Sequence, residues 1–163
     1  MGAAALIAAA ADASEEGQAI DSVVVLGTFA RLNRLAEGIA DQHFRWPLDW
    51  LVKYVAVPMA EAQTNAPLGA FAPAEHVPRI WPRPILIVHG LRDEIIPFTE
   101  AEALYGSAAQ PRHFLWIERA GHNDVLENQT VQQAILDFLA TAIPIPIVKN
   151  TDRSTPAAGK SPA

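Results

Sequence analysis

The 163-residue sequence contains no cysteine. This absence excludes disulfide bonds, thiolate metal sites and a cysteine nucleophile, and it leaves the redox compartment undetermined. Positive charge is also scarce, because twelve Lys and Arg stand against eighteen Asp and Glu and the formal net charge is -6. The chain therefore lacks the counter-charge that a phosphate backbone requires, and nucleic acid is not an expected partner.

Motifs for nucleotides, metals and membranes are missing as well. The sequence has neither a G-x-G-x-x-G pattern nor a Walker-type phosphate loop, and His43, His76 and His113 lack the spacing of a metal site. No cofactor is therefore expected. The apolar opening at residues 1–11 is shorter than the roughly 20 residues that span a bilayer. A secretory signal requires a basic region at its start, but the first basic residue of this sequence is Arg31. We expect a cytoplasmic protein without a membrane span.

Half of the residues are hydrophobic and 18% are charged, so the chain can fill a core. Its length suits one domain. After residue 143 the composition turns to Pro, Ser, Thr and Ala, which is typical of disorder. The prediction is one folded domain at 1–143 followed by a disordered tail at 144–163.

Three short apolar runs have the pattern of buried strands. They are residues 22–26 (Ser-Val-Val-Val-Leu), 85–90 (Ile-Leu-Ile-Val-His-Gly) and 113–117 (His-Phe-Leu-Trp-Ile). The first two are apolar runs rich in β-branched residues and closed by Gly27 and Gly90, as is typical of strands covered on both faces of a parallel sheet, and the third is a candidate strand that ends before Glu118.

Helical patterns alternate with these strands. An Ala-rich segment precedes the first strand, and alanine has the highest helix propensity. Residues 99–109 form a candidate helix with Thr99 as its N-cap, and residues 128–142 place a row of large apolar side chains on one face. The order predicts an α/β fold with three parallel strands and crossover helices.

The segment 46–59 lies between the first two predicted strands and is rich in apolar residues. Asp49 and Lys53 within it argue against a membrane span. Two interpretations stay open. The segment is an ordinary covering helix whose tryptophans fill the core, or it forms a lid or wall that holds an acyl chain.

Two polar residues follow neighbouring predicted strands. Asp93 comes after the strand at 85–90, and His122 comes after the strand at 113–117. Because the carboxyl ends of parallel strands line the ligand crevice, we expect Asp93 and His122 at the same edge of the sheet. An aspartate that accepts from the ring N–H fixes the tautomer of a histidine acting as a general base. A turn-forming role is the alternative for Asp93.

These segments resemble the α/β-hydrolase superfamily, in particular its small esterase, lysophospholipase-like and serine-aminopeptidase-like proteins. The resemblance rests on residues 83–97 and on Gly121-His122-Asn123-Asp124. It implies that Asp93 is the acid and His122 the base of a catalytic triad. It also implies acyl transfer from an ester, thioester or amide to water.

The nucleophile of that family is absent from the sequence. None of the five serines lies in a G-x-S-x-G motif (Ser14, Ser22, Ser107, Ser154 and Ser161). Met1-Gly2 followed by an Ala-rich helix resembles the end of such a motif, with the nucleophile immediately before Met1. We therefore expect the C-terminal part of a serine hydrolase, inactive as this chain.

A second hypothesis is a non-catalytic interaction module or hydrolase remnant. Without the strand that precedes the nucleophile, the strand at 22–26 has an open edge where another chain could pair. Among the remaining polar residues, His89 is expected to be structural and Glu94 to be exposed or a loop anchor. Asn123 and Asp124 are expected to organise the loop that carries His122, with a replacement acid as the alternative role of Asp124.

Overall fold

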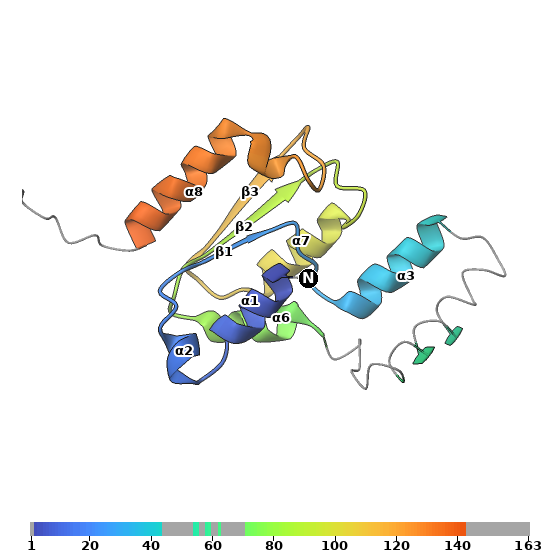
Figure 1. Ribbon diagram of the computed structural model, residues 1–163, viewed down its shortest axis with the longest axis horizontal. Coiled ribbons are helices and arrows are strands. Elements are labelled where there is room, and N and C mark those ends of the chain that lie inside the picture. The colour runs from blue at the N-terminus through green and yellow to red at the C-terminus, as the bar shows by residue number, and fades with distance from the viewer. Residues whose placement is uncertain (1, 44–53, 56–57, 60–61, 63–70, 143–163) are drawn as a thin grey trace, which may run out of the picture.

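A three-stranded parallel sheet forms the centre of the computed structural model, which describes residues 2–43, 54–55, 58–59, 62 and 71–142. The strand order is β1 (Val23–Leu26), β2 (Ile85–Gly90) and β3 (Arg112–Ile117) (Figure 1). In the register, Val23 lies opposite Ile85, and Ile85 lies opposite Arg112. The predicted fold class, three parallel strands with crossover helices, is confirmed.

The middle strand explains why the sheet forms in this order. All six residues of β2 are buried, whereas β1 and β3 contain half-buried or exposed positions. A strand without charged residues that runs through β-branched side chains can be covered on both faces, and this makes β2 suited to the centre. The described helices and 3-10 helices are α1 (Gly2–Ala10), α2 (Glu15–Gln18), α3 (Leu32–His43), α6 (Pro73–His76), η3 (Val77–Ile80), α7 (Phe98–Ser107), η4 (Val125–Glu127) and α8 (Gln129–Ala142).

Helices cover both faces of the sheet. On one face, α1, η3 and α7 pack on β1 and β2 through a core that includes Ile7, Ile87 and Leu104. On the other face, α8 packs through Val131 against Leu86 and neighbouring residues. Figure 1 shows α8 on one side of the sheet, with α1, α6 and α7 on the opposite side.

Arg83 joins the segments that lead into the sheet. Its guanidinium donates to the carbonyl oxygens of Ala10 at 2.6 Å and Gly17 at 2.6 Å, and also to those of Ile20 and Ile80. Arginine can satisfy several acceptors at once because its five N–H donors form a rigid planar group. The end of α1 and the α2 segment are thereby fastened to the start of β2.

One predicted helix start is wrong. The helix predicted at 99–109 is α7, and Pro97 occupies its N-cap position without a side-chain cap, while Thr99 lies inside the first turn. The structure thus begins this helix directly after a proline, which suits the start of a helix since it has no N–H to lose there.

Two other predictions fall on parts of the chain outside the description. The predicted tail at 144–163 lies entirely outside the described residues, and the segment 46–59 lies largely outside them. The domain limits and the role of 46–59 therefore stay predictions. None of the helices that the structure describes combines the length and apolarity of a bilayer-spanning helix.

Candidate active site

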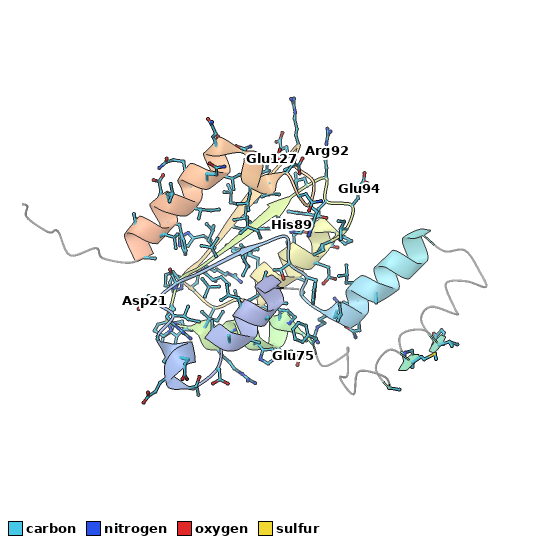
Figure 2. All side chains as sticks on the ribbon, in the orientation of Figure 1. Asp21, Glu75, His89, Arg92, Glu94 and Glu127 are labelled. Carbon is cyan, nitrogen blue, oxygen red and sulfur yellow. The ribbon has the colours of Figure 1, made fainter. Side chains whose placement is uncertain are left out.

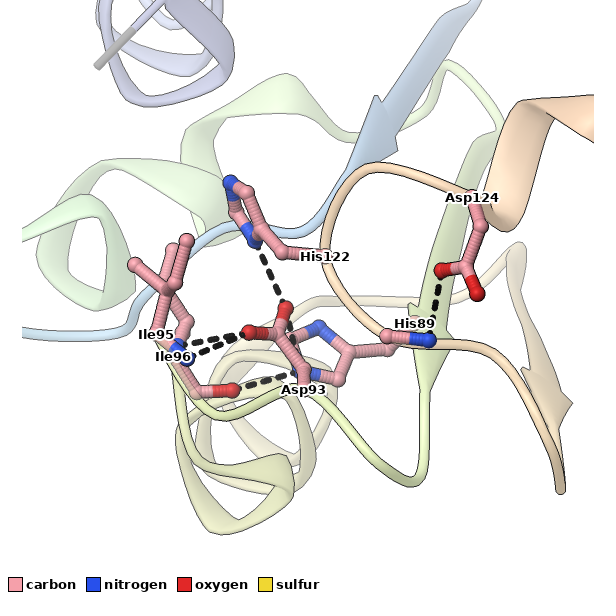
Figure 3. A network of polar contacts seen from close by, with 7 residues as sticks. His89, Asp93, Ile95, Ile96, His122 and Asp124 are labelled. Atoms are coloured by element: carbon pink, nitrogen blue, oxygen red, sulfur yellow. Dashed lines mark hydrogen bonds and ion pairs between the residues drawn. The ribbon is translucent and has the colours of Figure 1, made fainter.

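The loops after β2 and β3 bring Asp93 and His122 into direct contact. Nδ1 of His122 lies 2.7 Å from Oδ2 of Asp93, as Figure 3 shows. Gly90 permits this approach, because a Cβ atom at that position would lie 2.3 Å from the carbonyl oxygen of Ala120. Arg92 also donates its N–H to that oxygen, at 3.0 Å. The proximity that the sequence predicts for Asp93 and His122 is therefore present in the structure.

The two carboxylate oxygens of Asp93 have different hydrogen-bond partners. Oδ1 accepts the backbone N–H groups of Ile95 at 2.9 Å and Ile96 at 2.8 Å, while Oδ2 faces His122. The side chain is only 1% exposed. The turn-forming contacts of one oxygen and the contact of the other oxygen with the imidazole therefore coexist on one carboxylate.

The contact with Asp93 sets both the orientation and the tautomer of the His122 ring. A carboxylate only accepts hydrogen bonds, so Nδ1 carries the proton in the neutral ring and Nε2 carries the lone pair. The His122 side chain is 28% exposed, and Nε2 has no hydrogen-bond partner among the described residues. The arrangement leaves a base at the surface whose tautomer is set by a buried carboxylate.

Gly27 forms the support under the His122 ring. Its φ angle is +51°, and a Cβ atom there would lie 2.9 Å from Cε1 and 3.1 Å from Nδ1 of His122. The position thus requires glycine for its left-handed backbone and for the close approach of the ring. The sequence marks Gly27 only as the end of a strand, and a glycine closing an apolar run is the one signal that points to this position.

The N-terminal end of α1 lies beside this pair. Ala4, in the first turn of α1, is 1% exposed and packs with Phe29 and Ile96. Ile96 belongs to the loop whose backbone holds Asp93. The positive end of the helix dipole is thereby brought to the edge of the sheet that carries Asp93 and His122.

The described serines lie elsewhere. Ser14 caps α2, Ser22 immediately precedes β1, and Ser107 ends α7, where its hydroxyl donates to the carbonyl of Ala103 at 2.9 Å. Strands present the Asp93–His122 pair at their carboxyl ends, whereas Ser22 lies at the amino end of β1. Ser154 and Ser161 lie outside the described residues.

The remaining polar residues behave largely as the sequence suggests. His89 is 0% exposed, and its Nε2 lies 2.9 Å from the carbonyl oxygen of Ile96. Glu94 is exposed. Oδ1 of Asp124 accepts the N–H of Gly121 at 2.6 Å, which commits this carboxylate to the loop of His122. Within the described ranges, no group of three or more His, Asp or Glu residues could hold a metal ion.

Comparison with known proteins gives short sequence matches. No protein-family model matches the chain. Alpha/beta hydrolase domain-containing protein 17B of Homo sapiens is 50% identical over 42 residues, which are 26% of this chain and 15% of that protein. Alpha/beta hydrolase domain-containing protein 17C of Xenopus tropicalis is 34% identical over 61 residues, 37% of this chain and 20% of that protein. The matches thus span a small part of these relatives.

Similarity in structure extends over most of the chain. The acetyl xylan esterase from Paenibacillus sp. R4 aligns with a TM-score of 0.62 at 19% identity, covering 87% of this chain and 43% of that one. The esterase domain of a Rhodothermus marinus protein aligns with a TM-score of 0.54 at 19% identity, covering 86% and 54%. The chain thus corresponds to about half of each of these structures.

Proposed function

This chain carries part of the fold of the α/β-hydrolase superfamily, as its sequence predicts, and we propose that it forms the acid–base part of a serine hydrolase. The observation that carries the proposal is the buried Asp93 carboxylate 2.7 Å from Nδ1 of a partly exposed His122. Such a pair is the activating half of a nucleophilic triad.

In the proposed reaction, His122 accepts and then donates one proton in each of two half-reactions. A serine hydroxyl gives its proton to Nε2 of His122 while its oxygen bonds to the substrate carbonyl carbon. The imidazolium, stabilised by Asp93, then protonates the leaving alcohol, thiol or amine as the acyl bond breaks. Water repeats the sequence on the acyl-enzyme and restores the serine. The expected substrates are therefore esters, thioesters or amides.

The start of α1 is where we propose that the nucleophile acts. Ala4 shares a buried apolar cluster with Ile96, so the first turn of α1 lies near the loop that holds Asp93. Backbone N–H groups at a helix N-terminus stabilise the negative oxygen of an acyl-transfer intermediate. No serine among the described residues lies at this place, and we propose that the nucleophile is supplied by a segment upstream of Met1.

The coding DNA immediately upstream of the Met1 codon provides the first test. An in-frame Gly-x-Ser there would supply the nucleophile at the start of α1, as the proposal requires. A stop codon or an unrelated sequence at that place would contradict the serine hydrolase and favour the second candidate below.

Ester hydrolysis provides the biochemical test. We expect the 163-residue chain alone to show no hydrolysis of a chromogenic acetate ester that depends on His122. Extended upstream by a segment ending in Gly-x-Ser, it is expected to turn over, and His122→Ala should lower the turnover by about 10⁴-fold or more.

His113→Ala is the matched control, because His113 is an exposed histidine on β3. It should leave the turnover of the extended chain unchanged. Hydrolysis by the unextended chain that His122→Ala abolishes would show that the nucleophile lies within these 163 residues, contrary to the proposal.

The open edge of β1 favours a second candidate function, an interaction module. Among the described residues, β1 pairs with β2 on one side and with no strand on the other. An open strand edge offers unpaired N–H and C=O groups to an extended segment of another chain. A stable chain that binds a partner through β1, with no esterase activity after upstream extension, would support this function over the hydrolase.

A further inference from the structure

A second histidine, His89, lies beneath the Asp93–His122 pair. It is the penultimate residue of β2 and is 0% exposed. Its Nε2 lies 2.9 Å from the carbonyl oxygen of Ile96 and 3.6 Å from Oδ2 of Asp93. Figure 2 shows His89 inside the molecule and Glu94, from the following loop, at its periphery. The triad described above assigns His89 no role.

The surroundings of His89 determine where its proton lies. A carbonyl oxygen can only accept, so the hydrogen bond to Ile96 requires a proton on Nε2. Nδ1 is buried and has no hydrogen-bond partner among the described residues. A second proton on Nδ1 would bury an unpaired N–H and a positive charge, which is unfavourable. The neutral ring with its proton on Nε2 is therefore the form that fits.

Ile96 connects this ring to the acid. Its carbonyl oxygen accepts from His89, while its N–H donates to Oδ1 of Asp93 at 2.8 Å. The peptide groups that hold the Asp93 carboxylate are thus anchored to β2 through His89. The Ile96 side chain is 5% exposed and packs with Ala4 and Phe29, which ties the same loop to α1.

We propose that His89 is a positioning residue that orients Asp93 toward His122 through its hydrogen bond to the Ile96 carbonyl oxygen. This inference rests on the proposed acid–base function of Asp93 and His122. The charged and titratable groups facing the His89 ring are Asp93 and, across that carboxylate, His122, while Phe98 packs against it at 6.1 Å between ring centroids. The neutral N–H of His89 lies beside Oδ2 and favours the carboxylate form of Asp93. An imidazolium at His89 would instead draw Oδ2 away from His122.

Ring-nitrogen NMR of the ¹⁵N-labelled full chain at neutral pH tests the proposal. We expect His89 with its proton on Nε2 and His122 with its proton on Nδ1. His89→Phe removes the donor to Ile96, so the ratio of the Nδ1–H to the Nε2–H form of His122 should fall by about tenfold. His89→Gln, which can place an amide N–H near the position of Nε2, should keep the ratio close to that of the wild type.

His113→Phe is the control, since it removes an exposed histidine from the neighbouring strand and should leave the His122 tautomer unchanged. Thermal melting shows whether each variant is folded. A folded His89→Phe with an unchanged His122 tautomer would overturn the positioning role, and so would a folded His89→Gln that loses the Nδ1–H form.

Failure of the inference can be told apart from failure of the proposed function. If His122 in the wild type does not carry its proton on Nδ1, the Asp93–His122 pair itself fails. If His122 does but wild-type His89 carries its proton on Nδ1, only the role of His89 is overturned. That wild-type measurement decides the matter even where His89→Phe and His89→Gln do not fold.

Discussion

The His122 ring depends on the absence of a side chain at Gly27. The left-handed backbone there costs a residue with a Cβ atom about 1–2 kcal/mol, and the added methyl would lie 2.9 Å from Cε1 of His122. Gly27 thus contributes to the site because it has no Cβ atom. A search for chemically reactive side chains does not detect such a residue.

Gly27→Ala should therefore displace His122 and weaken its hydrogen bond to Asp93. We expect a loss of about 1–2 kcal/mol in the free energy of unfolding, measured by urea denaturation, and a smaller Nδ1–H population of His122 in ring-nitrogen spectra.

Gly106→Ala is the matched control for this change. Gly106 lies in α7, and a Cβ atom there would have nothing within 4 Å. It should stabilise the chain by about 0.4–1 kcal/mol. An unchanged His122 tautomer in folded Gly27→Ala would show that the ring does not rest on Gly27 in solution.

The carboxylate of Asp93 shows that turn formation and contact with a histidine do not exclude each other. Its first oxygen binds the N–H groups of Ile95 and Ile96 and makes the turn, and its second oxygen binds His122. The turn-forming role and the catalytic role are often treated as alternatives for an aspartate after a strand. Here the turn is what buries and aims the carboxylate.

At the level of elements, Glu100 connects α7 to the segment that leads into α3. Its Oε2 accepts the backbone N–H groups of Ala30 at 2.9 Å and Arg31 at 3.1 Å, and the residue is 8% exposed. The carboxylate satisfies N–H groups just before α3 that would otherwise lack an intrahelical acceptor. A residue in the first turn of its own helix thus also serves a different helix.

Glu100→Gln should lower the free energy of unfolding by about 1–3 kcal/mol, because a neutral amide oxygen replaces a carboxylate oxygen as the acceptor for one buried and one partly buried N–H group. Urea denaturation of the full chain measures this. Glu102→Gln is the control, since Glu102 lies in the same helix and is exposed, and should change stability by less than about 0.5 kcal/mol. Equal effects of the two variants would contradict the bridging role of Glu100.

Across the whole molecule, the feature with the largest consequence is the edge of β1. The N–H groups of Val23 and Gly27 donate to the carbonyl oxygens of Pro84, just before β2, and of Val88, within β2. Backbone groups alternate in direction along a strand, so the N–H of Val24 faces the other side, where no described strand pairs. An apolar strand with such an edge is prone to pair with another chain.

We expect the isolated chain to self-associate through this edge, with a mass in light scattering that rises with concentration. Val24→Pro removes the outward N–H at an edge position, where proline is tolerated, and should shift the chain toward the monomer. Val24→Thr keeps both the N–H and the β-branched shape, so it should associate like the wild type. A Val24→Pro variant that associates as strongly as Val24→Thr would place the contact elsewhere.

Much of the architecture followed from patterns along the chain. β2 was recognisable because its residues are continuously apolar, and its neighbours because short β-branched or aromatic runs alternate with helical segments. The start of α7 was not recognisable from the sequence, because Thr99 has the preferred chemistry of an N-cap but Pro97 occupies that position. Several side chains are compatible with a helix start, and packing chooses among them.

The parallel direction of the strands and the edge at which Asp93 and His122 meet follow from the sequence alone, because parallel strands joined by crossovers place their carboxyl ends together. The packed fold adds the close approach of His122 to Gly27, the hydrogen bond between His89 and the Ile96 carbonyl, and the hydrogen bond from Ala30 to Glu100. Connectivity fixes which loops are neighbours. Hydrogen bonds and ring contacts depend on separations of a few tenths of an ångström, which are settled when the packed segments come together.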